Sequence, residues 1–191
     1  MALANIACLL ARRPEVTRGV LIIDWDLEAP GLHRFFYPYL KPLRSSPRDN
    51  LLEIDSKPGL IDIFYELNSI TKEDAQPPET IAQSVVKTLR QKYLLQTTMP
   101  NLFLLKAGEF NENYPARVGA FQWENFYKNF PNFFTFFSQS LSEQFDYVLI
   151  DSRTGLNDTS GICTMLMPEK IVIVFTPNEQ SLLARLYPFG H

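Results

Sequence analysis

Residues 20–31 read V-L-I-I-D-W-D-L-E-A-P-G, and this stretch decides the fold class. Its first four residues are an uninterrupted apolar run, which is typical of a strand buried on both faces of a parallel sheet. The run ends in two acids separated by one residue, Asp24 and Asp26. Ligands bind beyond the carboxyl ends of strands in open α/β sheets, so the stretch predicts a functional edge at these acids.

A second stretch repeats this pattern. Residues 146–155, D-Y-V-L-I-D-S-R-T-G, are another apolar run that ends in an acid, Asp151, with a glycine four residues later. Further buried strands are predicted at 101–106 and 170–175. Two strands that bring three carboxylates to one edge indicate a site for a hydrated cation. The alternative interpretation is that the acids at the strand ends cap the following helices and that Asp26 is a solvated turn acid.

Helical patterns fill the segments between the predicted strands. The spacing of apolar residues predicts helices over 1–13, over 59–67 and from Pro77 onward, whereas the polar, proline-rich stretch 41–57 is expected to be an exposed loop. Aromatic residues recur every three or four positions over 123–145, with Pro131 as a break or helix start. This aromatic stripe is expected to be the inner face of a helix rather than a membrane or partner surface. Residues 1–191 are predicted to form a single α/β domain.

Composition limits the classes of function. The net charge is −3, which gives no global electrostatic reason to expect nucleic acid or an anionic membrane as partner. Cys8 and Cys163 form no C-x-x-C pattern and are expected to be reduced, as in a cytoplasmic protein. No segment approaches the roughly 20 apolar residues of a membrane-spanning helix. No G-x-G-x-x-G run is present, which disfavours a dinucleotide-binding domain.

The order of these elements, with D-W-D-L-E-A-P-G-L-H at 24–33 and I-D-S-R-T-G-L-N-D-T-S-G at 150–161, resembles a known family. It is similar to the MinD/ParA branch of the P-loop NTPases, also described as CobQ/CobB/MinD/ParA nucleotide-binding domains, and within it to large bacterial MinD-like ATPases. The resemblance extends from Met1 to about Ala184. It implies a three-layer α/β fold with a mostly parallel sheet and helices on both faces.

The resemblance also implies a Mg²⁺-dependent ATPase that acts as a nucleotide switch. Asp24 and Asp151 would hold the metal, with Asp151 as the Walker B acid, and Asp26 would orient or activate the attacking water in switch I. Gly155 would offer its backbone N–H near the γ-phosphate as part of switch II.

Two further expectations follow from the same resemblance. Pro177 and Asn178 match the loop that contacts adenine in relatives, and intact relatives form homodimers around the nucleotide. Arg153 is expected either to reach a phosphate or to pair with an acid. His33 is expected to be a plain loop histidine, and Ser152 and Ser160 have no histidine nearby in sequence that would favour a nucleophile.

One departure from the family pattern weakens the enzymatic interpretation. Relatives carry a phosphate loop of the form K-G-G-x-G-K-[ST] just before a helix like that predicted over 1–13, and the present sequence holds no G-K-[ST] run. The expectation is a domain truncated at both ends that binds ATP weakly or not at all. Two alternatives stay open: a non-catalytic interaction module on the same fold, with an exposed aromatic patch, and an amide ligase like cobyric acid or dethiobiotin synthetases, with a pocket beside Asp26.

Overall fold

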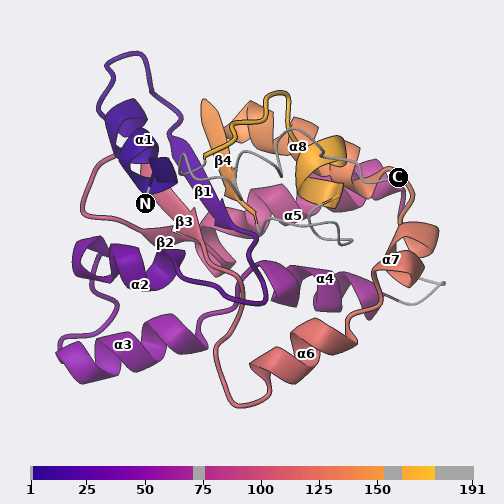
Figure 1. Ribbon diagram of the computed structural model, residues 1–191, viewed down its shortest axis with the longest axis horizontal. Coiled ribbons are helices and arrows are strands. Elements are labelled where there is room, and N and C mark those ends of the chain that lie inside the picture. The colour runs from indigo at the N-terminus through magenta and orange to yellow at the C-terminus, as the bar shows by residue number, and fades with distance from the viewer. Residues whose placement is uncertain (1, 71–75, 153–160, 175–191) are drawn as a thin grey trace, which may run out of the picture.

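A computed structural model describes residues 2–70, 76–152 and 161–174. In this part of the chain a four-stranded sheet lies among helices, which makes the fold α/β (Figure 1). Across the sheet the spatial order of the strands is β2-β3-β1-β4. Their bounds are Val20–Asp24 for β1, Leu95–Gln96 for β2, Leu102–Leu105 for β3 and Tyr147–Asp151 for β4.

The three longer strands are parallel, as their apolar sequences predict. β1 pairs with β3 on one side and with β4 on the other, whereas the short β2 runs antiparallel to β3. In this register Ile22 lies between Leu104 and Leu149, and Asp24 is the partner of Asp151. The sheet is therefore mixed but mostly parallel, and β1, β3 and β4 end at the same edge.

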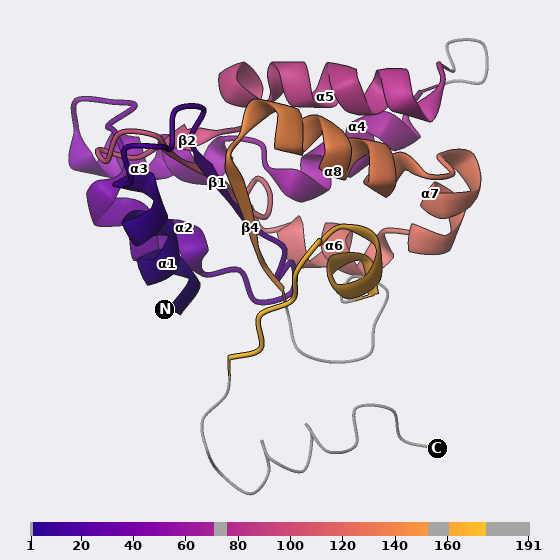
Figure 2. The ribbon, with the colours of Figure 1, turned by 90° about the horizontal axis from the view of Figure 1, so that it is seen from above.

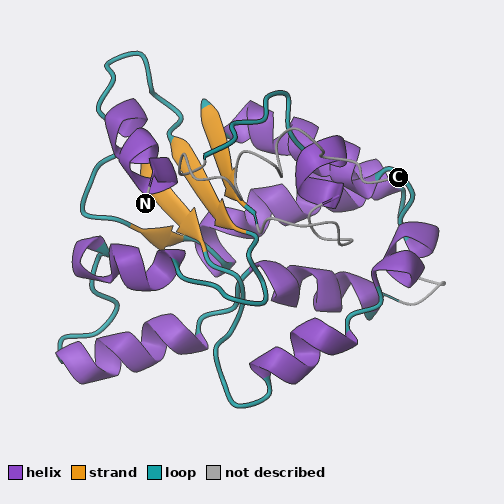
Figure 3. Cartoon of the chain, in the orientation of Figure 1, coloured by secondary structure: helices purple, strands orange, loops and turns teal. Residues whose placement is uncertain are grey.

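Helices occupy most of the remaining described chain (Figure 3). The helices predicted over 1–13, over 59–67 and from Pro77 are confirmed as α1, α4 and α5. The bounds are Ala2–Ala11 for α1, Leu32–Phe36 for α2, Pro47–Ser56 for α3, Leu60–Asn68 for α4, Pro78–Lys92 for α5, Tyr114–Ala120 for α6, Trp123–Asn129 for α7 and Phe133–Gln144 for α8, with a short 3-10 turn at Tyr37–Tyr39 and a π-helical turn at Ile162–Leu166. No described helix combines the length and the apolar character needed to cross a lipid bilayer.

Two apolar cores lie on the two faces of the sheet, because successive side chains of a strand point to opposite faces. Val20 and Ile22 pack in a core with residues of α1, α2 and α3. Leu21 and Ile23 pack in the other core with residues of α4, α5, α7 and α8. Figure 2 shows α1 and α2 on one side of the sheet and α5 and α8 on the other. All four of these β1 side chains are fully buried, as expected for a central strand.

The aromatic stripe is confirmed as an inner face, because its main rings are buried rather than exposed to a membrane or partner. It is divided between α7 and α8, which meet near Pro131. Phe64 of α4 lies at the centre of the cluster, with its ring centroid 5.2 Å from that of Trp123 and 5.4 Å from that of Phe126. Phe64, Phe126 and Phe133 are all fully buried. The cluster fixes α4, α7 and α8 against one another.

The loop predicted over 41–57 is wrong, because α3 forms within it. Polar composition concealed two helix signals: Pro47 stands in the first turn, where it needs no backbone donor, and Ile54 is fully buried against the sheet. The Asn50 side chain supports the turn before the helix, since its Oδ1 accepts the N–H groups of Leu43 and Arg44 at 2.6 and 3.3 Å. The burial of Ile54 and the Asp55 carbonyl, which accepts the Phe110 N–H at 2.8 Å, join this mostly polar helix to the rest of the fold.

The strand predicted over 170–175 is also wrong over its described part. Residues 170–174 join no sheet, and the side chains of Ile171 to Val174 are between 57% and 75% exposed. An apolar β-branched run forms a strand only where another strand offers it backbone partners, and sequence alone does not reveal whether such an edge is available. Residue 175 lies outside the described residues.

Candidate functional site

Asp24 ends β1 as a fully buried carboxylate. Its Oδ2 accepts the backbone N–H groups of Gly31 and Leu32 at 3.2 and 3.1 Å, which are the first amides of α2. The helix-capping alternative for Asp24 is therefore correct for one of its two oxygens. The other oxygen, Oδ1, is buried and has no hydrogen-bond partner within the described residues. An unpaired buried carboxylate oxygen is costly, so it marks a position where a proton or a cation would be stabilising.

The surroundings of Asp24 disfavour its negative charge. Burial raises the pKa of Asp24 from 3.8 to about 7, the hydrogen bond from Leu32 acts in the opposite direction, and the charges of Asp151 and Asp26 raise it further. Asp24 therefore binds a proton readily near neutral pH. A cation placed beside it would instead favour the ionised carboxylate.

Asp151 lies beside Asp24 on the neighbouring strand. The two are register partners at the ends of β4 and β1, and the Asp151 carbonyl accepts the N–H of Trp25 at 2.8 Å. The Asp151 side chain is half-buried, and burial raises its pKa, as does the charge of Asp26. The parallel register thus brings together the two carboxylates that the sequence proposes as metal ligands.

Asp26 lies two residues beyond the strand, in a turn that is closed by its own side chain. Its Oδ1 accepts the N–H of Ala29 at 3.2 Å. The buried Tyr114 of α6 donates its hydroxyl to the Leu27 carbonyl at 2.8 Å and so ties this turn to the helix. Across the described ranges, no three or more acids, histidines or cysteines are grouped to hold a metal ion, so the three carboxylates do not form a metal cage by themselves.

The remaining residues implied by the family resemblance cannot be placed at this edge. Gly155, Pro177 and Asn178 lie outside the described residues, as do Arg153 and Ser160. Their proposed contacts with nucleotide stay predictions.

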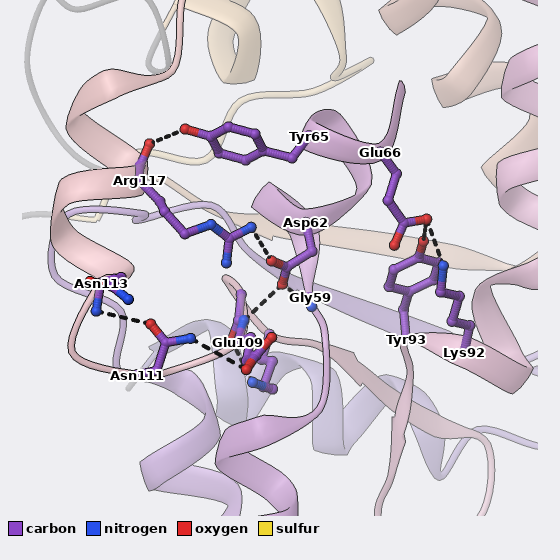
Figure 4. A network of polar contacts seen from close by, with 12 residues as sticks. Gly59, Asp62, Tyr65, Glu66, Lys92, Tyr93, Glu109, Asn111, Asn113 and Arg117 are labelled. Carbon is purple, nitrogen blue, oxygen red and sulfur yellow. Dashed lines mark hydrogen bonds and ion pairs between the residues drawn. The ribbon is translucent and has the colours of Figure 1, made fainter. Parts of the chain in front are cut away.

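The sequence did not indicate a buried polar network at the carboxyl end of β3, where α4 and α6 meet (Figure 4). Asp62, in the first turn of α4, accepts the backbone N–H groups of Gly59 and Glu109, each at 2.7 Å. It also accepts a hydrogen bond from Arg117 of α6 at 2.6 Å, as an ion pair. Asp62 therefore joins the start of α4, the loop after β3 and α6 through one side chain.

Lys106 and His33 lie in the same region, and both are buried. Lys106 donates through Nζ to the carbonyls of Asp55 and Gly108, and burial lowers its pKa to about 8. His33 was expected in a loop, but it lies in α2 with its ring centroid 4.2 Å from that of Phe110, and burial lowers its pKa to about 4. The signal for Lys106 was available in the sequence, since a lysine that ends an apolar strand has to be buried or paired.

A pocket with a volume of about 450 Å³ opens between α3 and the loop after β3. It is lined by Arg44, Asp49, Leu52, Glu53, Asp55, Ser56, Glu109, Phe110 and Asn111. Asp26 is not among its lining residues, so this pocket does not supply the substrate site beside Asp26 that an amide ligase needs. Cys8 and Cys163 are both free thiols, as expected.

No protein family model matches the chain, and no curated protein matches its sequence. Among solved structures it resembles the kinase domain of VpsO with 17% identity and a TM-score of 0.44, over 87% of this chain and 58% of that one. It resembles the chimerical protein CapA2B2 with 17% identity and a TM-score of 0.45, over 86% of this chain and 51% of that one. The chain thus spans less than two thirds of the length of either structure.

Proposed function

We propose that this chain is an ATP-binding, Mg²⁺-dependent P-loop NTPase domain of the MinD/ParA type, which acts as a nucleotide switch in the cytoplasm. One observation carries the proposal: the buried, unpaired Oδ1 of Asp24 lies in register beside Asp151 at the carboxyl edge of a parallel sheet. This edge is where open α/β sheets bind ligands.

The chemistry of the two carboxylates suits Mg²⁺. This ion takes oxygen ligands, keeps several of its waters and is usually bound by one or two carboxylates together with substrate phosphates. A pair of carboxylates fits that requirement better than a closed set of three. Asp24 and Asp151 would hold the ion or its waters, and the bound ion would neutralise charge on the phosphates during transfer.

The chain's own residues divide the remaining tasks. We assign to Asp26 the orientation of the attacking water, and the bonds that close its turn restrict where this carboxylate can lie. Gly155 is assigned to the γ-phosphate, and Pro177 and Asn178 to the adenine. A homodimer around nucleotide belongs to the same proposal.

The missing phosphate cradle sets the expected strength of binding. Phosphoryl transfer depends mostly on positioning and on neutralising phosphate charge, and the sequence holds no G-K-[ST] run to do this. This chain should therefore bind ATP weakly or not at all, and it should not hydrolyse ATP at a measurable rate.

A gain-of-function variant tests this proposal. A short strand and a K-G-G-x-G-K-[ST] loop fused ahead of Met1 should give micromolar ATP binding and Mg²⁺-dependent hydrolysis, measured by labelled-ATP titration and phosphate release. In that background Asp26→Ala should lower kcat by about 100-fold or more, because it removes a group that acts on the water. Glu28→Ala, an exposed acid in the same turn, is the matched control and should retain turnover.

Three results would contradict the proposal. A fused variant that folds but binds no ATP would remove the nucleotide assignment. Equal turnover in the Asp26→Ala and Glu28→Ala variants would remove the role of Asp26. Micromolar binding and turnover by the unmodified chain would contradict the expected weak binding and would show that the phosphate loop is not needed.

A further inference from the structure

Asp26 lies between two residues that are firmly held. Before it, Trp25 is buried and its N–H is bonded to the end of β4. After it, Leu27 is buried, donates its N–H to the Trp25 carbonyl at 2.9 Å, and accepts the Tyr114 hydroxyl on its own carbonyl at 2.8 Å. Asp26 itself is half-buried and binds the Ala29 N–H. The backbone on both sides of Asp26 therefore sets where its carboxylate lies.

Tyr114 is itself closely packed. Its ring centroid lies 4.9 Å from that of Phe110, and a Cβ added at Gly108 would lie 2.8 Å from its ring atom Cε2. Burial raises the pKa of Tyr114 and the charge of Asp24 raises it further, so the hydroxyl stays protonated and remains a donor at neutral pH. Tyr114 is the first residue of α6, so the place of its hydroxyl depends on the place of this helix.

α6 has little apolar contact to hold it. Of its seven residues, all of which are described, Tyr114 alone is buried, and Val118 is partly buried against the core. Helices shorter than about 12 residues are marginal in water unless other elements support them. The position of α6 therefore depends on specific contacts with its neighbours.

Three interactions with α4 hold α6 at Arg117. The guanidinium donates to Asp62 Oδ1 at 2.6 Å, and its Cζ lies 4.9 Å from the centroid of the Tyr65 ring. The Arg117 carbonyl accepts the Tyr65 hydroxyl at 2.7 Å (Figure 4). Tyr114 and Arg117 are three residues apart and so lie on the same face of α6. Contacts that fix Arg117 thus also fix Tyr114.

We propose that Arg117 is a positioning residue for Asp26. It acts through Tyr114, which α6 holds against the Leu27 carbonyl. The ion pair between Arg117 and Asp62 therefore supports the turn at the carboxyl edge of the sheet as well as the contact between α4 and α6. The task of Asp26 rests on the proposed function, whereas the coupling itself does not. Displacement of a catalytic group by about 1 Å can cost about 100-fold in rate, so such support matters to the reaction.

Amide hydrogen exchange of the full chain without Mg²⁺, followed by NMR at one pH, tests the coupling. The reporters are the amides of Leu27 and Ala29, and the second is bound by the Asp26 carboxylate itself. Tyr114→Phe should speed the exchange of both by about tenfold, because it leaves a buried carbonyl without its donor. Arg117→Met keeps the apolar stem but removes the guanidinium, and should speed both by about threefold or more.

Two further variants separate coupling from a general loss of stability. If Arg117 acts through Tyr114, the double variant Arg117→Met, Tyr114→Phe should exchange like Tyr114→Phe alone, because the path is already broken there. A change that only destabilises the fold would add to the effect of Tyr114→Phe. Arg117→Lys restores a positive charge beside Asp62 and should return the exchange most of the way to that of the parent.

Lys92→Met is the matched control. It also breaks a 2.6 Å ion pair of α4, the pair between Lys92 and Glu66, but that pair does not involve α6. It should leave both reporter amides as in the parent. If Arg117→Met does not fold, Tyr65→Phe is the milder test: it removes the hydroxyl bonded to the Arg117 carbonyl and should speed both amides by about twofold or more.

Three results would overturn the inference. The first is unchanged exchange of both amides in Arg117→Met and in Tyr65→Phe. The second is simple addition of the effects of Arg117→Met and Tyr114→Phe, and the third is an equal effect of Lys92→Met. None of them depends on nucleotide: a fused variant that binds no ATP would remove the task of Asp26 and leave the coupling intact, whereas unchanged exchange beside Mg²⁺-dependent hydrolysis would remove the coupling alone.

Discussion

Asp62→Ala is expected to lower the free energy of unfolding by about 3–5 kcal/mol, because it removes one partner of a buried ion pair. The lost carboxylate leaves the Arg117 guanidinium, which lies 2.6 Å away and is mostly shielded from water, without its counter-charge. It also leaves the backbone N–H groups of Gly59 and Glu109 without their acceptor. Equilibrium urea unfolding followed by circular dichroism would measure the change.

Glu66→Ala is the matched control on the same helix. Glu66 forms an ion pair with Lys92 at the same 2.6 Å distance and accepts the Tyr93 hydroxyl at 2.7 Å, but the side chains of Glu66 and Lys92 are half exposed, so its removal should cost no more than about 2 kcal/mol. The contrast tests burial, since both acids lie on the same helix and their ion pairs have the same distance. A loss at Asp62 no larger than that at Glu66 would show that the network does not join α4 to α6.

Asp24→Asn is expected to stabilise the metal-free protein at pH 7 and above, by up to about 4 kcal/mol. Asp24 has a pKa of about 7 in the folded chain against 3.8 as the reference value, so the folded state binds this proton more tightly than the unfolded state. Its stabilising contribution is complete below pH 4 and is lost as the pH rises through 7. Asparagine stays neutral throughout and keeps an oxygen for the amides of Gly31 and Leu32.

The measurement is the difference in unfolding free energy between Asp24→Asn and the parent, taken from pH 4 to pH 8 without divalent cations. The comparison with the parent is needed because His33 gives the unfolding free energy a pH dependence of the opposite sign. Its pKa is lowered to about 4, so its contribution to stability is lost as the pH falls. Subtracting the unfolding free energy of the parent cancels the contribution of His33, which both proteins share. The difference should rise steadily between pH 4 and pH 7, and a flat difference would contradict the raised pKa of Asp24.

Sequence alone could predict the central strands and the proximity of Asp24 and Asp151, because both depend on patterns within short segments. A buried parallel strand has to be apolar along its length, so the sequences of β1, β3 and β4 can be recognised as strands. Because these strands are parallel, their last residues lie at one edge of the sheet. The adjacency of Asp24 and Asp151 follows from that geometry.

The parts that sequence missed depend on contacts between distant segments. Asp62 resembles any acid in the first turn of a helix until the fold brings Arg117 beside it. The helix α3 is held by the burial of Ile54 and by the Asp55 carbonyl, which accepts hydrogen bonds from Lys106 and Phe110, and residues 170–174 have the composition of a strand but pair with none of the described strands. Whether a polar group is buried, or an apolar run is paired, is decided by the tertiary structure rather than by the local pattern.

The pKa of Asp24, measured by carboxyl ¹³C NMR with and without Mg²⁺, tests the proposed cation site most directly. Mg²⁺ at tens of millimolar should lower this pKa by about one unit or more, because a bound cation favours the ionised carboxylate, and Asp151→Asn should remove most of that shift. An Asp24 pKa that Mg²⁺ leaves unchanged in the folded protein would contradict a metal site at this edge of the sheet.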